Sequence, residues 1–557
     1  MALYPAPLGA YPLDSDLDCV TARRLAAGTY RDRDFRDDVL RDVYNAYSRR
    51  VAPSHGFDLV LVVRHAWAAW WLEAGQQMLL LIALGCWFAV RPLDAFITLD
   101  LLVISELLRR WLGWGLEYLG YGGHRDATYG QPEQVRERNL SFRGRLLRRL
   151  LAGALVVLVA LLLMSAASRR TRVSTASWAT ATTLTVAGII ITLVVVIALT
   201  AAIRARSLTR LRFAVPCRRA RPRRRLRAIE QQQRHPVTVH SGFKPFLGSG
   251  KQMRGWSFAQ RLVPANTVGT ERRREFDRPP FTTSGLVSRL REVIADLQHD
   301  DNPETSLPPL RVADCVFVEG TRAAGLGAAL AAGPESDEVK QAIADAIARP
   351  SGVARHYLCA QVVSWGGEVV TTVFVHVSLQ GRTLYIEFAT YALYPVRPEY
   401  GTDQVGGRRA GERAGAIGAA VARLPACLLE IKHLVSAPAI LLPALRAASA
   451  QMRVTALRGD IGANFSVREN AMIQPPTEQK DESESGYFQA QDIIQHSKII
   501  ERRLIAAIDD YLVKFGVDSS EFVQRTTAIL NNGILNMGSG TVNAENTAVG
   551  ENSTVFA

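Results

Sequence analysis

The sequence predicts an α-helical membrane region with four spans, two of them short, followed by a cytoplasmic α+β domain, a helical pair and a low-complexity tail. Three observations lead to this fold class: long apolar stretches, later segments of alternating β-branched residues, and a glycine- and asparagine-rich end. The clearest apolar stretches are residues 150–167 and 177–203, and neither has the polar stripe of a soluble amphipathic helix. Since a helix needs about 20 apolar residues to cross a bilayer, residues 150–203 should form a membrane hairpin.

A shorter pair of apolar stretches lies upstream, within residues 73–118. Residues 77–90 and 95–108 are separated by an Arg91-Pro92 step, and tryptophans suited to the headgroup zone stand on both sides. We expect a second, shorter hairpin here, which gives four spans in total. The alternative is a re-entrant or interfacial pair of helices.

Two acidic residues fall inside the second of these short stretches, Asp100 and Glu106. Ionisable groups are costly at membrane depth and commonly serve an ion path or an ion pair. Glu106 has Arg109 and Arg110 within helical pairing distance. Asp100 has no such neighbour and is therefore the better candidate for a transport role.

The net charge of +14 is concentrated in arginine-dense segments beside the apolar stretches. By the positive-inside rule, the connection 119–149 and the juxtamembrane linker 204–235 should be cytoplasmic. The N-terminal segment 1–72 and the C-terminal region should then also face the cytoplasm of a bacterial plasma membrane. The arginines of the linker suit anionic lipid headgroups, and with few aromatics among them no nucleic acid partner is expected. They are Arg218, Arg219, Arg221, Arg223, Arg224, Arg225 and Arg227.

The cytoplasmic α+β domain is expected over residues 236–470. Three runs, 356–364, 368–379 and 382–393, alternate β-branched and aromatic residues and are separated by glycine-containing turns, which predicts an antiparallel meander. Helical patterns at 285–298, 337–348 and 411–448 flank it. A register centred on Gly366 gives one apolar face, which should be the core side. That face comprises Tyr357, Cys359, Val373, Val375, Val377, Leu384, Ile386 and Phe388.

The opposite face of the predicted meander carries His356, His376 and Glu387. Two imidazoles and a carboxylate on one face are the groups of a metal site or an acid–base pair, although such a set is more commonly the polar side of a half-buried sheet. The scattered cysteines form no zinc-ligand spacing. No metal or other cofactor is therefore expected. The Gly248-Ser249-Gly250-Lys251 segment lacks two positions of the phosphate-binding loop pattern.

An acidic linker, 471–486, leads to a predicted pair of helices over 487–530, which would either dock on the domain or mediate homo-oligomerisation. The tail 531–557 repeats a short glycine-, asparagine- and valine-containing unit of the composition found in cross-β segments. The alternative is a disordered terminus. The residues expected to support assembly are Val542, Asn543, Val549, Gly550, Asn552 and Val555.

The segment from Val237 to Gly250, ending Ser-Gly-Phe-Lys-Pro-Phe-Leu-Gly-Ser-Gly and followed by Trp256-Ser-Phe-Ala, resembles a signature of uncharacterised actinobacterial multi-pass membrane proteins. Val51-Ala-Pro-Ser54 and Ser466-Val-Arg-Glu469 add to the resemblance, which implies no particular activity. The tail is similar to the motifs of bacterial amyloid signalling proteins related to the RIP homotypic interaction motif. It departs from them because one residue, not two, separates Gly550 from Asn552.

The sequence therefore favours a non-enzymatic, membrane-tethered assembly or signalling component, with a role in defence as one form of it. Its partners would be the lipid bilayer and further copies of the chain. Two alternatives stand beside this hypothesis. The first is a channel or transporter that uses Asp100 and Glu106, and the second is a membrane-bound, metal-dependent enzyme that uses the histidine face.

Overall fold

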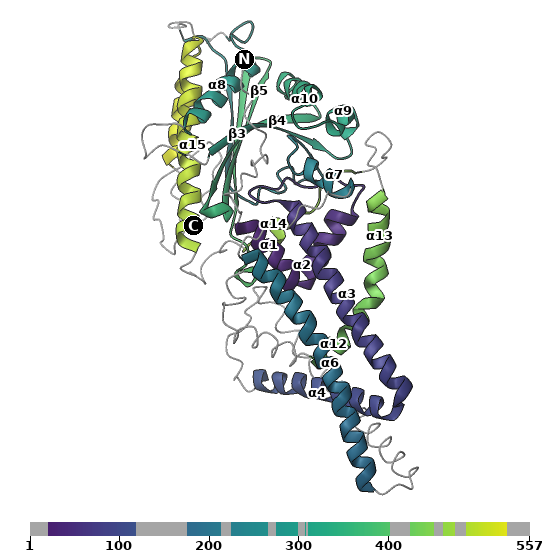
Figure 1. Ribbon diagram of the computed structural model, residues 1–557. Helices are drawn as coiled ribbons and strands as arrows, with labels where there is room; N and C mark the ends of the chain where they lie inside the picture. The colour runs from purple at the N-terminus through teal and green to yellow at the C-terminus, as the bar shows by residue number, and fades with distance from the viewer. Residues whose placement is uncertain are drawn as a thin grey trace. The chain divides into compact units, whose positions relative to one another are not determined.

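The computed structural model describes residues 20–118, 175–212, 224–265, 275–298, 307, 310–401, 424–449, 460–473 and 486–531 (Figure 1). The chain divides into two compact units. The sheet unit comprises Met1–Arg64, Pro216–Gly401 and Pro443–Ala557. The helical unit comprises His65–Val215 and Thr402–Leu442.

The sheet unit is built on one mixed six-stranded sheet with strand order β1-β3-β4-β5-β6-β2. The short edge strand β1 runs parallel to β3, and the other neighbours are antiparallel. The predicted meander is confirmed as β4–β6, but the sheet as a whole is mixed and not purely antiparallel. The strands are β1 Val237–His240, β2 Lys251–Arg261, β3 Leu310–Glu319, β4 Ala354–Ser364, β5 Val369–Gln380 and β6 Thr383–Leu393.

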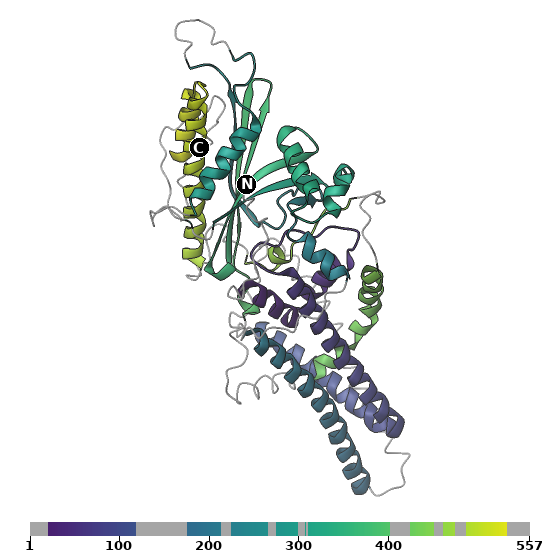
Figure 2. The same ribbon diagram turned by 45° about the horizontal axis from the view of Figure 1, so that its top comes forward.

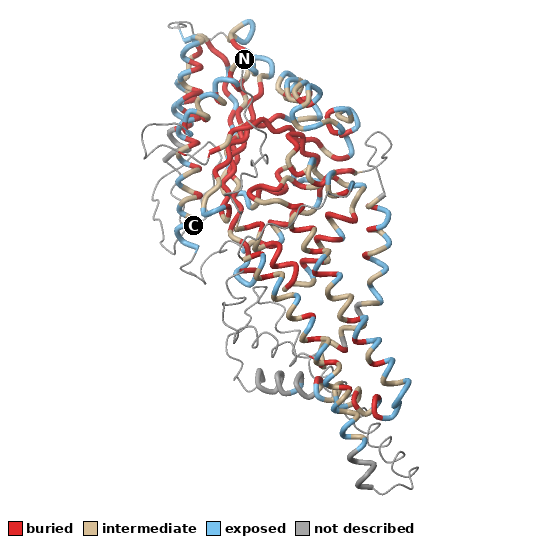
Figure 3. Tube along the Cα trace, in the orientation of Figure 1, coloured by how far each residue is buried: buried red, intermediate tan, exposed pale blue. Residues whose placement is uncertain are grey.

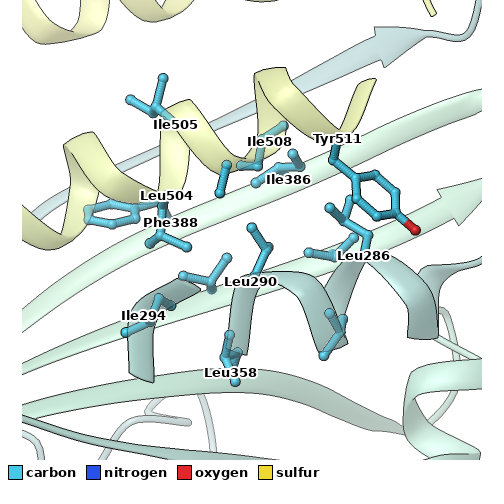
Figure 4. Packing of buried hydrophobic residues seen from close by; sticks show 14 of the residues in the cluster. Leu286, Leu290, Ile294, Leu358, Ile386, Phe388, Leu504, Ile505, Ile508 and Tyr511 are labelled. Carbon is cyan, nitrogen blue, oxygen red and sulfur yellow. The ribbon is translucent and has the colours of Figure 1, made fainter. Parts of the chain in front are cut away.

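One face of this sheet is covered by helices, and we call it the helix-covered face. Helices α8 (Thr283–Asp296) and α15 (Tyr487–Lys514) lie side by side on it, as both Figure 1 and Figure 2 show. Their leucines and isoleucines interdigitate with side chains of β4 and β6. Figure 4 shows this packing, with Leu290 of α8 inside the cluster. Each fully buried leucine or isoleucine contributes about 1.5–3 kcal/mol, so this layer is the main source of stability in the sheet unit.

Capping residues fix where the helices of this layer begin. The Thr282 hydroxyl accepts the Gly285 N–H at 3.2 Å before α8. The Ser336 hydroxyl accepts the Val339 N–H at 3.3 Å before α10 (Asp337–Ala348). Both follow the preference for hydroxyl side chains at a helix N-cap. With α9 (Gly327–Ala331), α10 packs on the valines of β1 and β3 and extends the same face.

The register between β4 and β5 differs from the predicted one by a single residue. Leu358 lies opposite Val375, so the centre of the hairpin falls between Gly366 and Gly367. The turn contains Trp365, Gly366 and Gly367, all with positive φ, which lengthens the connection. A one-residue shift exchanges the two faces of a strand. The prediction that Tyr357 and Cys359 share the apolar face is therefore wrong: Leu358, Ala360 and Val362 take that place.

The N-terminal segment belongs to the sheet unit. It forms α1 (Val20–Arg31), α2 (Arg33–Asp38) and a π-helical turn over Val39–Asn45. The Thr21 hydroxyl donates to the Gly367 carbonyl oxygen at 2.7 Å, and the Tyr400 hydroxyl donates to Asp32 at 2.5 Å. These bonds join residues more than 340 positions apart and fix the segment at the end of the β4–β5 hairpin.

The predicted C-terminal helical pair is present as α15 and α16 (Ser520–Asn531). Gly516 ends the first helix with a φ of 67°, as expected of a glycine C-cap. The predicted helix over 411–448 is described only from Leu424, where α12 (Leu424–Leu429), a 3₁₀ turn (Glu430–Ser436) and α13 (Ala437–Ser449) follow one another. The predicted domain boundaries within the chain stay a prediction.

The helical unit contains most of α3 (Leu59–Val90), together with α4 (Pro92–Tyr118), α6 (Thr175–Arg212) and α12. In the described part of the chain, two helices are long and apolar enough to cross a membrane, over Leu59–Val90 and Ala181–Arg212. The prediction of four spans is therefore not supported. Helix α4 is too rich in charge, carrying Asp94, Asp100, Glu106, Arg109 and Arg110. The stretch 150–167 lies outside the described residues.

Side-chain exposure on α3 and α6 follows the pattern of helices in an apolar surrounding. Leu80 of α3 and Ile189 and Leu193 of α6 are buried in a common cluster. Large apolar side chains on other faces are open, among them Ile82 at 54% exposure and Leu184 at 75%. Figure 3 shows the contrast between the nearly continuous burial of the sheet strands and the mixed exposure along these helices. Such exposed apolar surface is typical of a membrane or protein interface.

Candidate functional site

The opposite face of the sheet carries an aromatic cluster with Phe246 at its centre. The Phe246 ring stacks on Phe374 of β5, with ring centroids 4.5 Å apart. Phe317 of β3, Tyr357 of β4 and Tyr391 of β6 surround it at 5.0–5.1 Å. Aromatic pairs in these geometries contribute about 0.5–1.5 kcal/mol beyond their burial. This cluster fixes the loop 241–250 against the sheet.

A buried carboxylate holds the second half of that loop. One oxygen of Glu469 accepts the N–H of Gly248 at 2.7 Å and the N–H of Gly250 at 2.9 Å. Burial raises the pKa of the Glu469 carboxyl, and the two N–H groups and Lys244 partly offset this effect. Since Glu469 occupies these donors, the glycines do not present them to a phosphate, in keeping with the incomplete sequence pattern.

Three sequence segments that carry the family resemblance meet at this loop. The carbonyl oxygen of Pro53, in the Val-Ala-Pro-Ser segment, lies 2.6 Å from where a Cβ of Gly248 would stand. Ser466 caps the short helix α14 (Val467–Ala471), which carries Glu469. A small cavity lies between the Val-Ala-Pro-Ser segment and the segment around Ser466. It is lined mainly by Val51, Ala52, Pro53, Phe465, Ser466 and Val467. Its apolar lining and size indicate a packing defect and not a ligand pocket.

Arg468, next to Glu469, is completely buried and joins two further segments. Its guanidinium donates to the carbonyl oxygens of His55 at 2.8 Å and Glu368 at 2.7 Å. Burial and the charge of Arg468 lower the pKa of the His55 imidazole to about 4. A buried arginine that bonds to carbonyl oxygens organises the chain around it. Apart from the position of Arg468 in a signature segment, nothing in the sequence signals this role.

The predicted pair of histidines is not brought together. His356 lies on the helix-covered face, where its Nε2 bonds Asp314 Oδ1 at 2.8 Å, and Arg291 of α8 donates to both oxygens of Asp314. His376 lies on the opposite face, where its Nδ1 bonds the carbonyl oxygen of His356 at 2.7 Å. The one-residue register shift causes this separation.

His376 and Glu387 do lie together, directly opposite each other on β5 and β6. Tyr357 donates to Glu387 at 3.3 Å, and its ring lies 5.1 Å from that of His376. Burial lowers the pKa of His376 and raises that of Tyr357. In the described residues, no group of three or more histidine, cysteine or acidic side chains could hold a metal ion. A proton-transfer role for this trio stays untested.

Burial alone would raise the pKa of the Asp314 carboxyl, but its bonds and charge interactions with His356 and Arg291 lower it overall. The carboxylate therefore stays charged and ties α8 to β3 and β4. This arrangement of an acid between an arginine and a histidine fixes the helix on the sheet. It is a structural set on the helix-covered face, whereas the sequence offered His356 as a candidate for a metal or acid–base site beside the favoured interpretation as the polar side of a sheet.

The remaining candidate residues divide by position. Glu106 in α4 is fully buried and Asp100 is half-buried. Arg225, one of the arginines expected to face lipid, is buried at 4% exposure and donates to the carbonyl oxygens of Val43 and Tyr44. That expectation is therefore wrong for Arg225, while Arg224 and Arg227 are exposed. Arg218, Arg219, Arg221 and Arg223 and all the tail residues lie outside the described residues.

Sequence reasoning missed the role of β2 as a long edge strand. It has 11 residues, and among the described strands it pairs with β6 alone. Gly255, Ser257 and Ala259 are exposed on the opposite face, while Phe258 packs under α16, 5.1 Å from Phe522. The alternation in Trp256-Ser-Phe-Ala was the available signal. An exposed edge strand is a template for pairing with a further strand.

The fold and this site define a class: an α+β protein linked to apolar helices, with a sheet edge that no other described strand pairs with. Residues 255–543 match the family model described as the AbeC-like domain. Because the match covers more than half of the 557 residues, the chain belongs to the AbeC-like family. No curated protein and no solved structure matches it. The resemblance to actinobacterial membrane proteins stays a prediction.

Proposed function

We propose that this protein is a membrane-tethered component that assembles with further copies of itself, in signalling or defence. The single observation that carries the proposal is the free edge of β2 within the AbeC-like domain. This edge strand has 11 residues, against four in the other edge strand β1, and long edges are places where proteins associate. The apolar helices α3 and α6 support attachment to a bilayer.

The proposal predicts that the full chain is multimeric. We would purify it in detergent and in lipid nanodiscs and measure its mass by light scattering over a range of concentrations. A variant lacking residues 532–557 keeps α16 whole, and a variant with a glycine–serine segment of equal length is its control. Multimers of the full chain that dissociate in both variants support a role of the tail in assembly. A strictly monomeric full chain would overturn the proposal.

A second candidate function is ion transport. The observation that favours it is the complete burial of Glu106 in α4, within the helical unit. A carboxylate at such a position is expected to serve a path or a pair. Flux measured in liposomes should fall in Glu106→Gln and Asp100→Asn if these groups line a path. Unchanged flux in both variants, or no flux in the natural protein, would exclude it.

The metal-dependent enzyme is not proposed further. That hypothesis required His356 and His376 on one face of the sheet, and they lie on opposite faces. His376 and Tyr357 are buried, and with Glu387 they form a polar group beside the aromatic cluster.

A further inference from the structure

The backbone of β2 has one side committed to β6 and one side available. Leu262 N–H donates to the carbonyl oxygen of Arg382 at 2.9 Å, and Arg261 stands opposite Thr383. In an antiparallel pair, hydrogen-bonded and non-bonded residues alternate. The even-numbered residues from Trp256 to Leu262 therefore direct their backbone groups to β6. The odd-numbered residues direct theirs away from it.

Four residues thus point their N–H and C=O groups away from the sheet, and all four are exposed. They are Gly255, Ser257, Ala259 and Arg261. Within the described residues, no backbone group bonds to these outward groups. Small side chains at three of the four positions leave the approach to the edge open. This edge has the features of a β-augmentation site, at which main-chain hydrogen bonds supply the affinity.

We infer that the strand that pairs with this edge is the C-terminal tail, residues 532–557, of a second copy of this chain. The inference rests on the proposed function and identifies the surface and the segment that assembly would use. The family match supports it, because it begins in β2 at residue 255 and ends at residue 543. The first unit of the tail therefore belongs to the same family domain as the edge strand.

Charge also favours this occupant. Besides Arg254, which pairs with Glu501, strand β2 carries the exposed Lys251 and Arg261, whereas residues 532–557 contain two glutamates, Glu545 and Glu551, and no lysine or arginine. The tail has β-branched residues, glycine and asparagine and no proline, so nothing in it prevents strand pairing. An acidic strand beside a basic edge gains from opposite charges across the pair.

Reach allows the tail to meet the edge of a second copy as well as its own, and the experiment below distinguishes the two. Asp518 N–H donates to the Val263 carbonyl oxygen at 2.8 Å, so α16 starts at the end of β2. The 26 residues after Asn531 would span up to about 85 Å if extended, far beyond one domain. Each chain offers one edge and two tail units, and such a head-to-tail contact joins copies in a row.

The test uses two differently tagged full-length copies in detergent, one with Ala259→Cys and the other with Val542→Cys. Oxidation should join the two tags only when both cysteines are present, and copies with a single introduced cysteine control for the natural ones. Ser257→Pro in the copy that supplies the edge removes an outward N–H without breaking a bond to β6, so it should abolish the crosslink. Ser257→Ala is the matched control and should keep it.

A copy that carries both Ala259→Cys and Val542→Cys is tested beside them: a bond that forms within this single chain, without joining of the two tags, would mean that each tail pairs with its own domain and would overturn the inference. The absence of any crosslink would do the same. A folded Ser257→Pro variant is recognised by an unfolding temperature close to that of Ser257→Ala, and if it fails to fold, Ser257→Lys at the same edge replaces it. Multimers unaffected by these variants would reject the inference but leave self-assembly intact, whereas a monomeric natural chain would reject both.

Discussion

Glu469 accepts the backbone N–H of Gly248 at 2.7 Å, across 221 residues of sequence. The bond links the loop over the aromatic cluster to α14, and the same oxygen also accepts the N–H of Gly250. Because Gly248 is buried, no water readily replaces the carboxylate. Glu469 therefore holds together the segments that pack on the face of the sheet opposite the helix-covered face.

The first prediction concerns this carboxylate. Glu469→Ala should lower the free energy of unfolding by about 1–3 kcal/mol, because two N–H groups lose their acceptor inside the protein. Glu469→Gln keeps an oxygen at the same place and should lower it less. Thermal unfolding of both variants in detergent, compared with the natural chain, measures the difference. Equal losses in the two variants would show that the bonds to the glycines are unimportant.

A second prediction concerns the backbone that Glu469 holds. Gly250 has a φ of 94°, and a Cβ there would overlap the carbonyl oxygen of Ala392. Gly250→Ala should therefore cost about 3 kcal/mol or more, from strain and from displacement of β6. Gly242 is the matched control: its φ is 61°, and no atom lies within 4 Å of its Cβ position. Gly242→Ala should cost only about 1 kcal/mol, and similar unfolding temperatures for the two variants would contradict the assigned packing.

The course of the sheet shows which parts of the fold a sequence can predict. Runs of β-branched and aromatic residues between glycine-containing turns located β4, β5 and β6 to within a few positions, although β4 and β5 are buried on both faces. The predicted register between β4 and β5 is wrong because of the turn after Ser364, where Trp365 adopts a φ of 55°. Few residues other than glycine, asparagine and aspartate take that conformation, so nothing in the sequence signalled it. The register that follows from this turn places His356 on the other face of the sheet, so the predicted site does not form.

The prediction of the membrane region was incomplete for a different reason. Hydropathy identified the apolar residues of α3 and α6 correctly. It did not show that α3 begins at Leu59, 18 residues before the predicted stretch, because Arg64, His65 and Glu73 interrupt the apolar residues there. The burial of two arginines was not predicted, for a related reason. The residues around Arg225 and Arg468 resemble those around exposed arginines. Only the tertiary fold brings these two side chains to the carbonyl oxygens to which they donate.

A third prediction concerns a buried acid beneath β2. Glu501 of α15 is fully buried, accepts the indole N–H of Trp256 at 2.6 Å and pairs with Arg254 at 3.3 Å. Removing one partner of a buried ion pair costs about 3–5 kcal/mol, so Glu501→Ala should severely destabilise the sheet unit. Trp256→Phe removes only the neutral donor and should cost about 1–3 kcal/mol. Chemical denaturation of the two variants should show this order, and the reverse order would contradict it.

The last prediction concerns acid sensitivity, which two buried histidines should set. Burial is the main cause that lowers the pKa of His55 and of His235 to about 4, from an ordinary value of 6.5. The His235 ring is held neutral: its Nδ1 accepts the Val237 N–H at 3.0 Å, and its Nε2 lies 3.2 Å from the Ala329 carbonyl oxygen.

Between pH 6.5 and 4 the unfolded chain binds protons that the folded chain refuses, so the stability present above pH 6.5 is lost as pH falls through this window. Each histidine accounts for up to about 3 kcal/mol of that loss. The unfolding temperature should therefore drop steeply from pH 7 to pH 5, and His235→Gln, which does not titrate, should flatten the profile. His240→Gln, at the partly exposed end of β1, is the matched control and should leave the slope as it is. If His235→Gln also left the slope unchanged, the acid sensitivity would have to arise elsewhere, and His55→Gln would then show whether the second buried imidazole carries it.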